Sequence, residues 1–165
     1  MAKMKVQGTE EYALKLSKLG KDINKVAGKA IFGAADIVAN EIKANIANLE
    51  AKHDKYNLAA FRKKEKGMLT IAQKKGLLES FGITKMEKNE KGYIDVKLGF
   101  DGYNSVKTKT YPKGQPNQLI ARTLESGSSF MDPVPFVRPA VNATRRAAKE
   151  KMQQVIDEET KKIME

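Results

Sequence analysis

The stretch ESGSSFMDPVPFVRPAVNA, residues 125–143, holds the side chains of this sequence that come nearest to a reactive site. Ser126, Ser128 and Ser129 surround Gly127, which is superficially similar to the turn that carries a serine nucleophile. The nucleophile elbow of hydrolases needs the pattern Gly-x-Ser-x-Gly, and both flanking glycines are missing here. The one histidine, His53, would have to be the only imidazole base of a Ser-His-Asp triad. These residues therefore favour a turn over a catalytic loop.

Other catalytic and ligand-binding patterns are missing as well. The absence of cysteine excludes disulfides, thiolate metal sites and a cysteine nucleophile. His53 has no second histidine at metal-ligand spacing, so we expect it to be exposed. No Gly-x-x-x-x-Gly-Lys-Ser/Thr phosphate loop occurs. Glu79 and Glu125 could in principle form the carboxylate pair of a glycosidase, but the residues around them do not favour this role. We expect no enzymatic activity, no cofactor and no metal.

A strong positive charge distinguishes the chain. Its net charge is +11 and its pI is near 9.7, which favours polyanionic partners. Residues 51–91 hold eleven basic and five acidic residues, a net charge of +6. Tyr56 and Phe61 lie among these lysines, and phosphate contacts with base stacking need this combination. The candidate contacts with DNA or an acidic surface are Arg62, Lys63, Lys64 and Lys66. A lysine-rich solvated loop is the open alternative.

Periodicity predicts the elements that must position these side chains. Alternation over 4–6 predicts a short first strand, and Thr9 is expected to cap a helix that ends at Gly20. Apolar residues at three- and four-residue steps over 23–49 predict a second, longer helix. Gly28 and Gly33 in this helix would let another element approach its backbone closely.

The middle of the chain alternates between loops and strands. We expect a basic mobile excursion at about 51–75, with one or two helical turns at most, broken at Gly67. Alternation in 92–100 predicts a strand that forms a β-hairpin with 83–88. A polar loop at about 101–117 and a further strand over 118–125 are expected to follow.

The prolines predict a stiff connection to the last helix. Pro133, Pro135 and Pro139 fix φ, and Pro139 suits the first turn of a C-terminal helix. We expect Arg138 to pair with a carboxylate such as Glu125. The ring of Phe136 either belongs to the core of the subunit or anchors a neighbouring subunit.

The order of elements predicts one α+β domain over 1–165. Its small antiparallel β-sheet should carry the long N-terminal helix and the C-terminal helix on one face. No apolar run approaches the ~20 residues that span a bilayer, and no signal peptide is expected, so we expect a soluble, unsecreted protein with no membrane contact.

Two short motifs stand before and within the run of prolines. Ile120-Ala121, Glu125, Gly127 and Ser128 form the first, and Pro135, Phe136, Arg138, Pro139 and Ala140 form the second. With these motifs the chain resembles the gp ten-like family of tail-component, or head–tail joining, proteins of long-tailed bacteriophages and prophages. That family shows Tyr-Ala-x-x-x-Glu-x-Gly-Thr before Pro-Phe-x-Arg-Pro-Ala. The first pattern is filled here with two replacements, Ile120 for the aromatic residue and Ser128 for threonine, and the second without change.

Further resemblance lies upstream. The family's Thr-Gly-x-Leu-x-x-Ser-Ile element is similar to KKGLLESF, which keeps Gly76, Leu78 and Ser80. The N-terminal strand and helices expected here are also similar to the family's opening. The resemblance covers most of the chain except the basic excursion and the 101–117 loop.

The resemblance implies a structural, non-enzymatic virion protein assembled in the bacterial host cytoplasm. It would form a homo-oligomeric, hexamer-like ring at the neck or tail end, between the connector or adaptor and the tail-tube or tail-terminator proteins. The interface residues would be Glu125, Gly127, Pro135, Phe136, Arg138 and Pro139. Non-specific DNA contact would come from the lysine loops. The alternative is a basic nucleic-acid-binding module.

Overall fold

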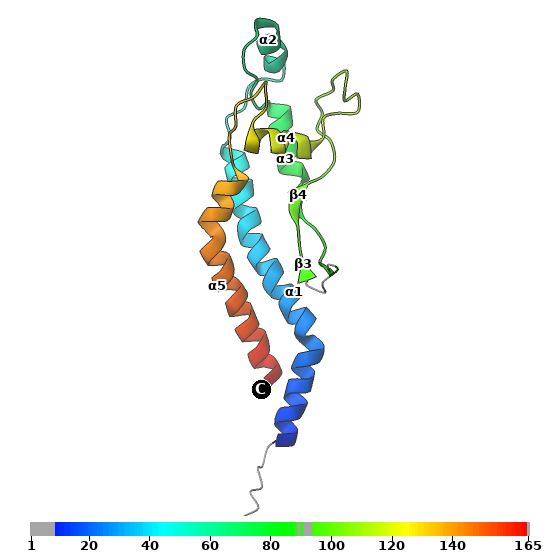
Figure 1. Ribbon diagram of the computed structural model, residues 1–165, viewed down its shortest axis with the longest axis vertical. Helices are drawn as coiled ribbons and strands as arrows, with labels where there is room; N and C mark the ends of the chain where they lie inside the picture. The colour runs from blue at the N-terminus through cyan, green and yellow to red at the C-terminus, as the bar shows by residue number, and fades with distance from the viewer. Residues whose placement is uncertain (1–8, 89, 91–93, 165) are drawn as a thin grey trace, which may run out of the picture.

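The chain folds into an elongated α+β structure, as the sequence predicts (Figure 1). The computed structural model describes residues 9–88, 90 and 94–164. Two long helices run side by side in opposite directions, and shorter elements gather around one end of the pair. The elements in chain order are α1 (Thr9–Asn48), α2 (Tyr56–Lys63), α3 (Ile71–Ser80), β1 (Phe81–Ile83), β2 (Glu87–Lys88), β3 (Ile94–Asp95), β4 (Leu98–Phe100), α4 (Asn117–Ser126) and α5 (Val137–Met164).

Helix α1 is one continuous helix of 40 residues, roughly 60 Å long at a rise of about 1.5 Å per residue. Thr9, the residue expected to cap it, is its first described residue, and the predicted end at Gly20 is wrong. A single glycine inside a helix costs only about 1 kcal/mol, which the apolar residues on both sides outweigh. The strand expected over 4–6 lies outside the described residues.

Small residues let α5 and the sheet approach α1. Ala30 and Ala34 are buried, and a Cβ at Gly33 would lie 3.6 Å from the side chain of Lys151 on α5. A Cβ at Gly28 would lie 2.8 Å from the sulfur of Met86, in the β1–β2 connection, which confirms the expected close approach at this glycine. Packing of this kind needs side chains no larger than a methyl group at the contact.

The long helices are also joined by charge. Lys29 of α1 forms an ion pair and hydrogen bond with Glu159 of α5, and Lys162 bonds the same carboxylate. Only residues 160–164 of α5 lie beyond this link, whereas α1 has twenty residues before Lys29. The N-terminal part of α1 therefore extends past the end of α5 (Figure 1).

The β-structure is an antiparallel hairpin broken into two pieces. Strand β1 pairs with β4, where Phe81 faces Phe100, and β2 pairs with β3, where Glu87 faces Asp95. The expectation of a hairpin is confirmed, but a continuous strand over 92–100 is wrong. Val96 and Lys97 separate β3 from β4, and Thr84 accepts a hydrogen bond from the Lys97 N–H there.

Residues 118–125 are not a strand. They lie in the helix α4, whose buried residues are Asn117, Ile120, Ala121 and Leu124. These positions follow steps of three, one and three residues, which is the period of a helix and not of a strand.

The expected basic excursion at 51–75 contains two helices. Its first, α2, agrees with the one or two turns anticipated, while α3 begins inside the segment with a capping box between Thr70 and Gln73. The chain is held at both ends of α2: the Lys52 N–H donates to the Leu69 carbonyl at 2.8 Å. Lys74 of α3 donates to the carbonyls of Ala47 and Leu49 at the end of α1.

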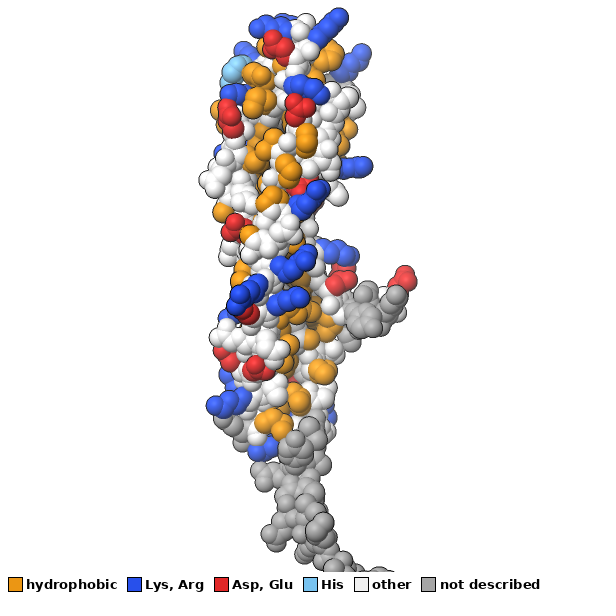
Figure 2. All heavy atoms as spheres, turned by 60° about the vertical axis from the view of Figure 1, so that its left-hand side comes forward, with side chains coloured by type: hydrophobic (Ala, Val, Ile, Leu, Met, Phe, Trp, Pro, Cys, Tyr) orange, Lys and Arg blue, Asp and Glu red, His pale blue; other side chains and the backbone are white. Residues whose placement is uncertain are grey.

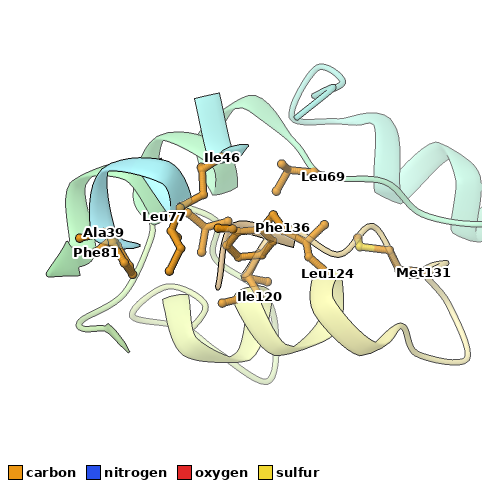
Figure 3. Close-up of a cluster of buried hydrophobic side chains, with 12 residues drawn as sticks. Ala39, Ile46, Leu69, Leu77, Phe81, Ile120, Leu124, Met131 and Phe136 are labelled. Carbon is orange, nitrogen blue, oxygen red and sulfur yellow. The ribbon is translucent and has the colours of Figure 1, made fainter. Parts of the chain in front are cut away.

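The core lies where α1, α3, α4 and the start of α5 meet (Figure 3). Phe136 points into the middle of this cluster, with Leu124, Ile120 and Leu77 around it. Its ring also packs edge-on against the ring of Phe100, with centroids 6.0 Å apart. The ring centroids of Phe100 and Phe81 are 5.0 Å apart. One aromatic side chain thereby joins the sheet, the helices and the proline segment.

Candidate interaction site

The proline segment, residues 127–136, connects α4 to α5, and one carboxylate holds its end. Glu125 Oε2 accepts hydrogen bonds from the N–H groups of Phe136 and Val137, both at 2.9 Å. Its Oε1 accepts the Arg138 N–H at 3.0 Å, and the Arg138 side chain lies 3.9 Å away. The expected pairing of Arg138 with Glu125 is therefore present, but the backbone contacts are closer.

These contacts satisfy the start of α5 completely. A helix leaves its first four N–H groups without an internal partner. Here three of them donate to Glu125, and the fourth position is Pro139, which has no N–H group. The predicted place of Pro139 in the first turn is confirmed, since α5 begins at Val137.

The charge of Glu125 is matched to this position. Partial burial alone would raise the pKa of Glu125, but the N–H groups of Val137, Phe136 and Arg138 and the Arg138 charge together lower it below its ordinary value. A carboxylate beside a helix N-terminus is further favoured by the helix dipole. Glu125 therefore acts as a structural anion.

Two backbone hydrogen bonds and a buried ring hold Phe136 in place. Its N–H donates to Glu125, its carbonyl accepts from Asn45 Nδ2 of α1 at 3.0 Å, and its ring is only 1% exposed. Of the two placements considered for this ring, the structure shows the one in the core of the chain. The ring is therefore not part of its exposed surface.

The serines of this segment form a turn. Ser128 Oγ accepts the N–H groups of Phe130 and Met131, and the Ser128 N–H donates to the Met131 carbonyl at 2.8 Å. Gly127 has φ +76°, and a Cβ there would lie 3.0 Å from Pro133 Cδ. Glycine is thus required twice over, by its φ and by the proline beside it.

The outer side of the segment is exposed. Pro133, Val134, Pro135 and Pro139 all face solvent, with Val134 47% exposed. The Val134 N–H donates to the Leu124 carbonyl at 2.7 Å, so the backbone of the exposed stretch is hydrogen-bonded to α4. It therefore presents apolar atoms on a fixed backbone.

The basic candidates lie at the α2 end of the molecule, and the proline segment meets them there. The Gly67 N–H donates to the Phe130 carbonyl at 2.7 Å. Lys66 donates to the Ser129 carbonyl at 3.3 Å and pairs with Asp132 at 3.4 Å. Arg62, Lys63 and Lys64 are exposed beside this junction. The sequence did not predict that these two segments meet.

The residues considered for catalysis remain dispersed. His53 is exposed, as expected, and lies edge-on to Tyr56. Glu79 pairs with Lys75 on the surface of α3. Within residues 9–88, 90 and 94–164, no group of three or more His, Asp or Glu side chains is arranged to hold a metal ion. No helix in those same residues is long and apolar enough to cross a membrane.

Replacement of Phe136 by alanine should lower the free energy of unfolding by about 3–5 kcal/mol, because it removes a buried ring and leaves a cavity. Chemical denaturation followed by circular dichroism measures this loss. The control is Phe61→Ala, where an exposed ring is removed. Equal small losses in both variants would contradict the core role of Phe136.

Glu125→Gln should lower the free energy of unfolding and should also make this free energy depend less on pH in the acid range. A carboxyl with a lowered pKa in the folded chain stabilises the fold above its ordinary pKa of 4.5, and this stabilisation disappears as the pH falls through the lower value. We expect the variant to lose about 1–3 kcal/mol at neutral pH.

Denaturation at several pH values between about 7 and 2 tests this. Glu159, whose pKa is lowered to about 2 by hydrogen bonds from Lys29 and Lys162, should leave a residual acid dependence in the variant. Glu79→Gln, on an exposed pair, is the control. If Glu125→Gln and wild type show the same slope below pH 5, the carboxylate does not hold the junction.

Comparison with protein-family models, with curated proteins and with solved structures gives no match to this chain.

Proposed function

We propose that the chain is a structural protein of a tailed bacteriophage or prophage, which assembles into a homo-oligomeric ring at the head–tail junction or tail end. Its neighbours there would be the connector or adaptor on one side and tail-tube or tail-terminator proteins on the other. The observation that carries the proposal is the geometry of the proline segment, whose residues also carry the resemblance to the gp ten-like family.

The geometry divides these residues between two roles. Glu125, Gly127 and Phe136 face inward and fix the segment. Pro135, Arg138 and Pro139 face outward together with Val134. A segment that is already fixed loses little conformational entropy on docking, which suits repeated, identical contacts in a ring. The proposed interface is therefore the outer face of residues 133–139.

The part of α1 that runs toward the N-terminus also exposes apolar side chains. Ile23 and Leu14 are each 57% exposed there, on opposite sides of the helix because they are nine residues apart. This part of α1 and the proline segment lie toward opposite ends of the structure (Figure 1). Two different surfaces that meet between copies give a head-to-tail contact, which closes into a ring when the rotation allows.

Particle assembly tests the proposal. In lysates of the virus that encodes the chain, tailed particles counted by negative-stain electron microscopy should be lost without it. Val134→Asp should reduce tailed particles at least tenfold while leaving thermal unfolding unchanged, because it charges the outer face only.

The matched control is Ile71→Asp, at an exposed position on α3 away from the segment, which should leave particle counts unchanged. Mass photometry should find the wild-type chain as a ring, in solution or on isolated necks. A chain that stays monomeric while tailed particles form normally without it would contradict the proposal.

A further inference from the structure

The α2 end of the molecule carries a cluster of basic side chains, which we call the basic tip. Arg62 and Lys63 end α2, and Lys64 and Lys66 follow directly. All four side chains are exposed, and Figure 2 shows basic side chains at this end of the molecule, with some acidic ones among them. A cluster at an extremity is reachable by a long polymer from several directions.

Most of this charge is not neutralised within the chain. Lys66 pairs with Asp132 at 3.4 Å, but Arg62, Lys63 and Lys64 have no carboxylate within ion-pair distance among the described residues. Glu65 is the one acidic residue between Lys55 and Gly67. Three free cations side by side repel one another, so an anionic ligand would relieve this repulsion.

Two aromatic rings flank the cations. Phe61 is 71% exposed, and its ring lies edge-on to Phe130 with centroids 6.2 Å apart. They line a hollow of about 510 Å³ together with Arg62, Lys64 and Lys66, and with the one carboxylate of Glu65. A large exposed ring costs hydration free energy. In a T-shaped contact Phe130 can cover at most one face of Phe61, so an open face is left for a flat partner.

The backbone of the basic tip is strained at a lysine. Lys64 has φ 58°, the one positive φ among the described residues other than glycine. Its N–H closes α2 on the carbonyls of Ala60 and Phe61. Glycine or asparagine is the usual residue here, and a lysine costs about 1 kcal/mol more. Strain of this kind, where a cheaper residue would serve the fold, points to a role for the side chain.

The hollow is preformed. The Gly67 N–H bonds the Phe130 carbonyl at 2.7 Å, and a Cβ at Gly67 would lie 2.1 Å from the Phe130 ring. Lys66 bonds the Ser129 carbonyl from the other side. These contacts fix the loop that carries Phe130 against the loop that follows α2, so the rings and cations keep their spacing.

We infer that the basic tip binds single-stranded nucleic acid. Arg62, Lys63 and Lys64 contact the phosphates, and an unpaired base stacks on the open face of Phe61. Exposed aromatic rings beside a basic groove are what sequence-independent single-strand binding requires. Bases of a duplex are already stacked on each other, and an acidic peptide supplies charge without a flat ring. This inference does not depend on the proposed function.

Fluorescence anisotropy with a labelled oligothymidylate of about 20 nucleotides tests the inference on the full chain. Phe61→Ala should raise Kd about tenfold, the loss of one stacked base, without a change in thermal unfolding. Tyr103→Ala is the matched control, since its ring is 63% exposed on a different loop, and its Kd should stay within twofold.

Salt dependence separates phosphate contacts from other binding. Three phosphate contacts give a slope of about −2 for log K against log salt with single strands. The double variant Lys63→Glu, Lys64→Glu should flatten this slope to less than half, whereas Lys149→Glu on α5 should not. Lys64→Gly, which keeps the backbone turn but removes the charge, should lower affinity and leave the fold intact.

Several results would overturn the inference. The first is no binding of the oligonucleotide at about 50 mM salt, where phosphate contacts are strong. The second is an equal loss of affinity in Phe61→Ala and Tyr103→Ala. The third is that polyglutamate displaces the labelled oligonucleotide as effectively as unlabelled oligonucleotide does. The last result would assign the basic tip to an acidic protein surface. None of these measurements involves particles, so their failure is distinct from a failure of the proposed ring.

Discussion

The structure depends on how the chain enters α5. One carboxylate, that of Glu125, accepts three backbone N–H groups, and Pro139 removes the need for a fourth partner. The residue at this entry, Phe136, sends its ring into the core and its carbonyl to Asn45 of α1. A single residue therefore fixes α5 relative to α4, α1 and the β1–β4 hairpin. The 28 residues of α5 then pack along α1.

This arrangement explains why the proline segment is both rigid and exposed. The backbone N–H groups of Val134 and Phe136 are bonded to α4, whereas the side chains of Val134 and Pro135 face solvent. The same rigidity extends to the α2 end, where the segment is bonded to Gly67 and Lys66. The proposed ring interface and the basic tip are two ends of one fixed connection.

The sequence predicted the parts of this structure that depend on the types and spacing of nearby residues. The apolar period of residues 23–49, the close approach at Gly28, the turn at Ser128 and the first-turn Pro139 all follow from side-chain type and spacing. One error, the strand expected over 118–125, arose where two periods compete. Residues 118–125 contain a short apolar run typical of strands within a longer helical repeat, and burial against the core selects the helix.

The arrangement of the candidate site was beyond prediction for a different reason. The contact between residues 66–67 and 129–132 joins segments about sixty residues apart, and no local signal specifies it. Gly67 was identified only as a break, although its lack of a side chain is what admits the Phe130 ring. The sequence left two alternatives for the ring of Phe136, burial in the core of the chain or contact with a neighbouring subunit. Only the packing of α1, α4 and β4 decides between them.

Amide hydrogen exchange, resolved by residue with NMR in the isolated chain, tests the central claim most directly. If the junction is preformed, the N–H groups of Phe136, Val137 and Arg138 should exchange as slowly as those of Ile42 and Ile46 in the core of α1. Exchange of these three amides as fast as those of the exposed residues Lys107 and Lys109 would contradict the account, because the segment would then be ordered only by a partner.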